Sequence, residues 1–110
     1  MDNAVSFQKS AYNDWEILSI IGRIDVATSA SVEEAGAEVL TSSDKIAVDM
    51  SATDYISSAG LRVLLRLSKK AKRAEKLFVL FGATGMIKDV FAASGMDMLV
   101  TVYNSKNDLP

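Results

Sequence analysis

Two adjacent serines, Ser57 and Ser58, are the residues of this 110-residue chain whose type and position favour chemistry. They follow a segment at 45–49 that resembles a short buried strand and then a short polar turn, and a segment with helical spacing begins directly after them. The first N–H groups of a helix lack partners within the helix, and the helix dipole makes this end partially positive. A phosphate on a hydroxyl at this point would leave the fold intact, so the sequence predicts a modification switch rather than a catalyst.

The same spacing allows a simpler role for Ser58. Serine is among the residues preferred at helix N-caps, where its hydroxyl accepts a backbone N–H. Because such caps are common and phosphoserines are few, spacing alone favours capping. Gly60 is also open to two interpretations: the missing side chain lets the helix approach the sheet, or it exposes the loop to a modifying enzyme.

Histidine and cysteine are both absent from the chain. Disulfides, thiolate metal sites, Ser-His-Asp hydrolysis and imidazole acid–base catalysis therefore have no residues to use. The carboxylates of Asp25, Asp49 and Asp54 are not spaced as a compact metal site, and helix capping and turn formation are the favoured roles for them. We therefore expect no catalytic residue, no bound metal and no cofactor.

Length and composition indicate the class of protein. The length suits a single domain, residues 1–110, and 49% hydrophobic with 24% charged residues is typical of a soluble globular protein. The N-terminal residues lack the basic and apolar regions of a signal peptide, and no segment reaches the length of a membrane span. A cytoplasmic location without membrane insertion is expected. The net charge of -2 points to no class of partner.

Periodicity and turn residues predict the elements that position the serine pair. In chain order these are strands at 5–9 and 15–21, a helix after 28–31, a strand at 45–49, a helix ending at about 74, a strand at 77–81, a helix at about 86–94 and a strand at 98–102. Gly95 fits the glycine that follows the C-terminus of the third of these helices. This order predicts an α/β domain: a mostly parallel central sheet with an N-terminal hairpin and with crossover helices packed on the sheet. The run at 77–81 is apolar without alternation, which indicates a central strand covered on both faces.

The helix that begins at the serine pair has the clearest pattern. Its apolar stripe predicts the face that packs on the sheet: Leu61, Leu64, Leu65, Ser68 and Ala71. Its other face is basic and carries Arg62, Arg66, Lys69, Lys70 and Arg73. No aromatic residues interleave with these charges and the chain as a whole is acidic, so we interpret the basic residues as a solvated face or a patch for an acidic protein partner. Nucleic acid is not expected as a partner.

Four motifs in this order resemble those of one family. They are Gly-Arg-Ile-Asp at 22–25, Val-Asp-Met-Ser at 48–51, Tyr-Ile-Ser-Ser-Ala-Gly-Leu at 55–61 and Phe-Ala-Ala-Ser-Gly-Met-Asp at 91–97. With these motifs the chain resembles a STAS domain of the anti-sigma factor antagonist group, which are small bacterial regulators of transcription. The motifs together span nearly the whole chain.

The resemblance implies a partner and an acceptor. An anti-sigma factor that is also an ATP-dependent serine kinase binds the unphosphorylated antagonist and phosphorylates a serine or threonine in the third motif, and a separate phosphatase removes the phosphate. Position in the motif places the acceptor at Ser58. Many relatives have aspartate immediately before the acceptor, whereas this chain has Ser57, which stays a second candidate acceptor. ATP belongs to the kinase.

The resemblance also implies a partner-binding surface around the acceptor. Its expected members are Asp25, Asp54, Tyr55, Ser57, Ser58, Ala59, Gly60, Arg62 and Arg66. Phosphorylation adds about -1.5 to -2 charges at a site that the partner must cover, so it is expected to abolish docking while leaving the fold nearly unchanged.

Two alternatives stay open at this point. The first keeps the fold without the switch: an unphosphorylated STAS adaptor subunit, for example of a membrane lipid-transport complex. The second is an enzyme that binds a nucleotide or another small molecule. It would need acids or bases with perturbed pKa values, for which the sequence offers few candidates.

Overall fold

An antiparallel hairpin begins the fold in the computed structural model, which describes residues 5–110. It consists of β1 (Val5–Tyr12) and β2 (Trp15–Ile24), joined at Asn13, whose φ of 55° lies in the left-handed region that asparagine tolerates. The predicted hairpin is confirmed, but both strands are longer than expected. The extra residues of β2 pair with a strand that the sequence pattern did not reveal.

That strand is β4 (Thr53–Ile56), in the segment where a polar turn was expected. β2 pairs with β4 in parallel from Gly22 to Ile24, and the register shifts between Gly22 and Arg23. The Thr53 hydroxyl also donates a hydrogen bond of 2.6 Å to the Ile20 carbonyl oxygen. The predicted turn is confirmed at Ser51 and Ala52. The strand after it was missed because four residues give too short a pattern, and it is the pairing with β2 that makes 53–56 a strand.

The remaining strands complete a six-stranded sheet of order β1-β2-β3-β5-β6, with β4 off this path. The predicted strands at 45–49 and 77–81 are confirmed as β3 (Lys45–Asp49) and β5 (Leu77–Phe81). β6 (Val102–Tyr103) pairs with β5 in parallel, as β5 does with β3 and β3 with β2. The α/β class, with a mostly parallel sheet and an N-terminal hairpin, is therefore confirmed.

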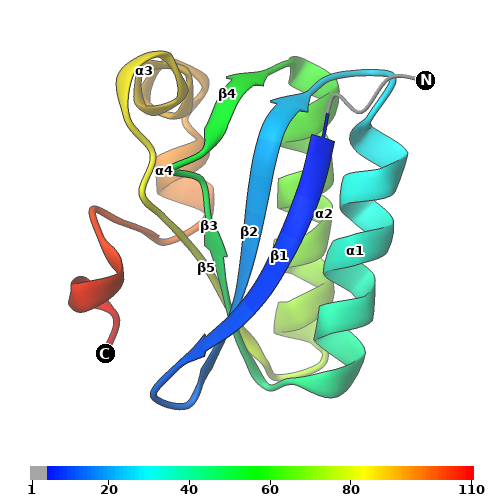
Figure 1. The fold of residues 1–110 in the computed structure, drawn as a ribbon, viewed down its shortest axis with the longest axis vertical. Coiled ribbons are helices and arrows are strands. Elements are labelled where there is room, and N and C mark those ends of the chain that lie inside the picture. Colours follow the sequence, from blue (N-terminus) through cyan, green and yellow to red (C-terminus); the bar gives the residue numbers. More distant parts are fainter. Residues whose placement is uncertain (1–4) are drawn as a thin grey trace.

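Helices α1 (Ser29–Ser42) and α2 (Ser58–Arg73) lie side by side along one face of the sheet (Figure 1). The buried residues of α2 are Gly60, Val63, Leu64, Leu67 and Ala71. Leu61, Leu65 and Ser68 are only partly buried, although Leu61 and Leu65 pack against the core, so the buried sector of α2 differs from the predicted stripe. The buried sector is rotated because α2 packs against α1 as well as against the sheet: a Cβ added at Gly36 of α1 would lie 2.5 Å from Leu67 Cδ1.

The opposite face of the sheet is covered in part by the C-terminal segment. A second buried cluster lies there and consists of Trp15, Ile17, Ala47, Val79, Phe81 and Leu109. The Trp15 indole Nε1 donates a hydrogen bond of 2.9 Å to the Pro110 carbonyl oxygen and so joins this segment to the hairpin. Because Phe78 and Leu80 belong to the larger cluster under the helices, β5 is covered on both faces as predicted.

Helix α3 (Gly85–Ser94) lies next to β4 (Figure 1) and ends at Gly95, whose φ of 77° confirms the predicted glycine C-cap. A short helix, α4 (Met96–Leu99), follows at once, so the strand predicted at 98–102 is wrong in its first half. Met98 and Leu99 are 87% and 62% exposed, which means that their hydrophobicity does not reflect burial in a strand. Among residues 5–110, no helix has the length and apolar character needed to cross a membrane.

Candidate functional site

The serine pair lies where β4 passes into α2, and Ser57 is the residue that caps the helix. Its backbone is extended, with φ -96° and ψ 176°, and its N–H donates to the Ile24 carbonyl oxygen at 2.9 Å. Its hydroxyl oxygen accepts from the Gly60 N–H at 3.4 Å. Ser57 is half-buried, and both its backbone and its side chain serve the start of the helix.

Ser58 is the first residue of α2 and is exposed. Its hydroxyl makes no hydrogen bond to another of the residues that the structure describes. The capping role that spacing favoured for Ser58 is therefore wrong by one residue, since the capping hydroxyl is that of Ser57. The structure separates two neighbouring side chains of identical chemistry into one that is engaged and one that faces solvent.

Gly60 lies on the inward side of the same helical turn and is buried. A Cβ at this position would lie 2.7 Å from Ile24 Cγ2, 2.8 Å from Ile56 Cγ1 and 3.1 Å from the Ile24 carbonyl oxygen. The packing interpretation of this glycine is confirmed: the missing side chain lets the first turn of α2 approach β2 and β4. Gly60 offers a partner no exposed surface of its own.

A mainly apolar groove of about 220 Å³ lies beside Ser58, where α2 faces α4 and the end of α3. Its lining residues are Ser58, Leu61, Arg62, Leu65, Ser94, Met96 and Leu99. Sequence reasoning assigned Leu61 and Leu65 to the core and placed Leu99 in a strand, so it missed this groove. The signal that could have revealed it was the width of the apolar stripe of α2, which exceeds what the sheet alone can cover.

The turn that follows β2 contributes Asp25 to this end of the molecule. Its carboxylate accepts hydrogen bonds from the Ala27 and Thr28 N–H groups at 3.0 and 3.1 Å. Partial burial acts to raise the pKa of the Asp25 carboxyl, but the hydrogen bonds from Thr28 and Ala27 outweigh it and hold that pKa below its ordinary value. Asp25 therefore has the turn-forming role that the sequence favoured.

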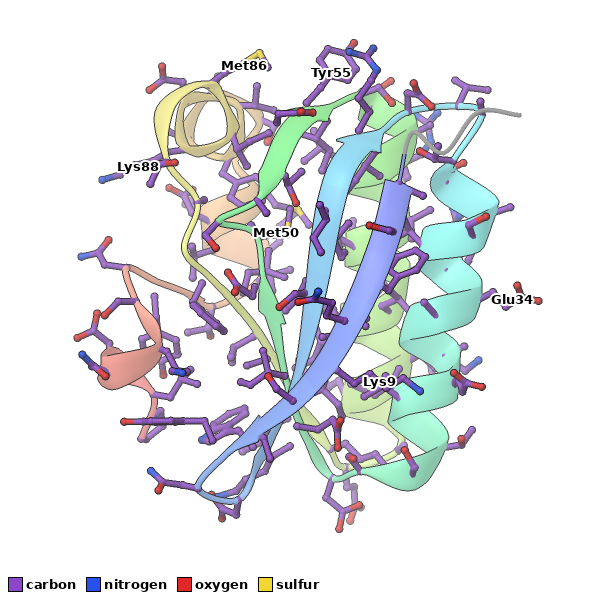
Figure 2. The ribbon with its side chains drawn as sticks, viewed as in Figure 1. Lys9, Glu34, Met50, Tyr55, Met86 and Lys88 are labelled. Atoms are coloured by element: carbon purple, nitrogen blue, oxygen red, sulfur yellow. The ribbon has the colours of Figure 1, made fainter. Side chains whose placement is uncertain are left out.

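Arg23 joins this turn to β4. Its guanidinium carbon lies 4.2 Å from the centre of the Tyr55 ring, and its Nε lies 3.5 Å from an Asp25 carboxylate oxygen. Tyr55 and Met86 lie at the end of the molecule where α2 begins (Figure 2). The structure thus brings Asp25, Tyr55 and Ser58 to one end of the molecule, although they come from three different elements.

The other residues that the sequence assigned to the partner-binding surface lie on β4 and along α2. Asp54 is exposed on β4, and Ala59 is half-buried in the first turn of α2. Arg66 faces α1, where its Nε and a terminal guanidinium nitrogen each donate to Glu33 at 2.9 Å. These hydrogen bonds hold the pKa of the Glu33 carboxyl below its ordinary value. Arg62, one turn earlier, lines the groove.

The carboxylates that were considered for metal binding serve the backbone. Asp49 accepts the Ser51 N–H at 2.9 Å, and Asp25 closes the turn described above. Within the described part of the chain, no cluster of histidine, cysteine, aspartate or glutamate side chains has the arrangement of a metal site. The exposed Ser58 hydroxyl, the apolar groove and the Arg62 guanidinium lie together at the start of α2.

Two known proteins are similar to this chain in sequence. RsfB of Mycobacterium tuberculosis, an anti-sigma-F factor antagonist, is 28% identical over 108 residues, which cover 96% of this chain and 87% of RsfB. BtrV of Bordetella bronchiseptica, provisionally named an anti-sigma factor antagonist, is 35% identical over 85 residues, which cover 74% of this chain and 73% of BtrV.

A solved structure agrees with the fold. An anti-sigma factor antagonist from Mycobacterium paratuberculosis superposes with a TM-score of 0.87 at 20% identity, over 98% of this chain and 92% of that one. The sequence model of the STAS domain matches residues 6–109. Because this match covers nearly the whole chain, as the four sequence motifs led us to expect, the chain belongs to the STAS domain family.

Proposed function

We propose that this chain is an anti-sigma factor antagonist that a single phosphate switches off. In the unphosphorylated state it binds an anti-sigma factor with serine kinase activity. It thereby competes with the sigma factor or other protein that this kinase otherwise binds. Phosphorylation of Ser58 releases the kinase, and a serine phosphatase restores the binding state. The relatives RsfB and BtrV support the class of partner through their names.

The observation that carries this proposal is the exposure of Ser58 beside an engaged Ser57. A kinase must reach the hydroxyl oxygen of its acceptor, and Ser58 presents that oxygen at the surface. Ser57 is half-buried, and its hydroxyl oxygen is already engaged as the acceptor of the Gly60 N–H, so it is less accessible to a kinase. The geometry therefore favours Ser58 over Ser57 as the acceptor.

The reaction on this chain is a phosphoryl transfer. The Ser58 oxygen bonds to the γ-phosphorus of ATP, the bond between that phosphorus and the bridging oxygen breaks, and ADP leaves. The hydroxyl proton passes to a base. The kinase supplies ATP, its metal ions and the base, so this chain contributes only the positioned hydroxyl and is the substrate rather than an enzyme.

The groove explains how one phosphate can control docking. Ser58 lines it together with Leu61 and Leu65 of α2 and Leu99 of α4. A partner that fills this apolar groove must cover the Ser58 side chain. Burying an unpaired phosphate in such an interface costs several kcal/mol, and each 1.4 kcal/mol is a factor of ten in affinity. Phosphorylation therefore weakens binding by orders of magnitude.

The test is incubation of the chain with its cognate kinase and ATP, followed by intact-mass measurement and a binding assay. We expect the mass of one phosphate on the wild type and on Ser57→Ala, and none on Ser58→Ala. The Ser58→Ala variant should bind the kinase and stay bound when ATP is added. Phosphorylation that persists in Ser58→Ala and disappears in Ser57→Ala would move the acceptor by one residue. Binding without any gain of mass would indicate an adaptor that is not phosphorylated.

A further inference from the structure

We propose that Arg62 binds the phosphate of phosphorylated Ser58 within the same helix, so that one modification both adds charge and withdraws a guanidinium from the docking surface. This inference rests on the proposed phosphorylation of Ser58. The proposal adds to that function an ion pair within the phosphorylated chain. This ion pair changes the net charge of the surface around Ser58 that a partner would contact.

Helix geometry places the two side chains together. Ser58 and Arg62 are four residues apart in α2, and residues at this spacing are neighbours on the helix surface. Side chains of a helix lean toward its N-terminus, so the Arg62 side chain lies over the turn that contains Ser58. Both residues line the same groove. An acidic group N-terminal to a basic group at this spacing is the favourable order for an ion pair.

The ion pairs of the described residues leave Arg62 available. Arg66, one turn further, is held by Glu33 in two hydrogen bonds of 2.9 Å. Arg23 is held against Tyr55 and Asp25. Arg62 is exposed and forms no ion pair with any carboxylate that the structure describes. Of these three guanidinium groups, Arg62 is the one that a phosphate on Ser58 can recruit without breaking an existing contact.

The chemistry of the pair is specific. A guanidinium matches a phosphate with two parallel N–H···O hydrogen bonds, and such charge-assisted bonds are stronger than neutral ones. The dianionic form of the phosphate gains more from this contact than the monoanionic form. Arg62 therefore lowers the pKa of the second ionisation of the phosphate, the step between its monoanion and its dianion. In the unmodified protein the same guanidinium is free to pair with an acidic group of the partner.

The test uses phosphoserine installed at position 58 by genetic-code expansion, so that no kinase is needed. We expect ³¹P NMR to give a titration midpoint lower by about 0.2 to 0.4 pH units in the wild type than in Arg62→Gln, with most of the shift restored in Arg62→Lys. The matched control is Arg73→Gln, the same chemical change in the last turn of α2, which should leave the midpoint unchanged.

Two results would overturn the proposal: equal midpoints in the wild type and Arg62→Gln, or an equal shift in Arg73→Gln, which would indicate long-range charge only. Arg62 is exposed, so Arg62→Gln should fold, and circular dichroism checks this. Because the phosphate is installed without the partner, the outcome is independent of the kinase assay above. An absent Ser58 phosphorylation in that assay would defeat the proposed function, whereas equal midpoints here would defeat only the pairing with Arg62.

Discussion

The inward and outward faces of α2 differ in what they contact and therefore in what each can tolerate. The inward face packs through Gly60, Leu64 and Leu67 against the sheet and α1 with almost no exposed surface. The outward face begins with the exposed Ser58 and continues with exposed basic residues. A change of charge on the outward face disturbs no packed contact, whereas a change of volume on the inward face does. One helix can thus both stabilise the fold and present the proposed phosphorylation site.

The largest expected effect comes from two leucines three residues apart. Leu64 is 0% exposed, so Leu64→Ala should lower the free energy of unfolding by about 2 to 5 kcal/mol through lost burial and a cavity. Leu61 lines the groove and is only partly buried, so Leu61→Ala should lower it much less and should weaken binding to the kinase instead. Urea denaturation and a binding titration of both variants make the comparison, and equal losses of stability would contradict it.

Gly60→Ala tests the closest approach on the inward face. The added methyl group would lie under 3 Å from side-chain carbons of Ile24 and Ile56, and 3.1 Å from a backbone oxygen that cannot rotate away. We expect the free energy of unfolding to fall by about 1 to 3 kcal/mol, as measured by urea denaturation. An unchanged or raised stability would show that the first turn of α2 can move away from the sheet.

Ser57→Ala and Ser58→Ala compare the two hydroxyls directly. Ser57→Ala removes the N-cap and should lower the free energy of unfolding by about 1 kcal/mol. Ser58→Ala removes an exposed hydroxyl and should change it by less than about 0.5 kcal/mol. Thermal and urea denaturation of both variants measure these changes. A larger loss of stability in Ser58→Ala than in Ser57→Ala would contradict the assignment of Ser57 as the N-cap.

The smallest expected effect is at the Arg66–Glu33 ion pair on the outward face. Both side chains are largely solvated, at 54% and 41% exposed, so the pair adds little. The pKa of Glu33 is lowered in the folded state, so its stabilisation is present above the pKa of the unfolded chain and is lost as the pH falls through the folded pKa. Arg66→Gln should therefore cost slightly more stability at neutral pH than in acid. A larger cost in acid would contradict the sign.

Most of the fold followed from patterns within single segments. The strands at 45–49 and 77–81 and the glycine C-cap at Gly95 are strong local signals, and the structure contains all three. β4 and α4 were missed because each is only four residues long. Such short segments take their conformation from a neighbour, which is β2 for the strand and the end of α3 for the helix. A periodic pattern needs more residues than these segments contain, so it cannot predict them.

The candidate site also has one part that followed from the sequence and another that only the tertiary structure revealed. The position of the serine pair at the start of a helix followed from the sequence, as did the basic residues that follow it. The groove beside Ser58 did not, because its walls come from residues 58–65 and 94–99, which are far apart in the chain. Arg62 and Arg66 are identical in type and lie on adjacent turns, yet among residues 5–110 only Arg66 forms an ion pair with a carboxylate, since Glu33 belongs to another helix.

The amino-acid sequence was enough to establish the order of most elements, the family motifs and a hydroxyl at a helix start, because these depend on residues that are near one another in the chain. It could not say which of two adjacent serines is engaged. That depends on how far the first turn of α2 approaches Ile24 and Ile56 at Gly60, which places the Ser57 oxygen over the Gly60 N–H and leaves the Ser58 oxygen in solvent. Contacts between distant segments set that approach, so only the folded chain determines which serine is presented to a partner.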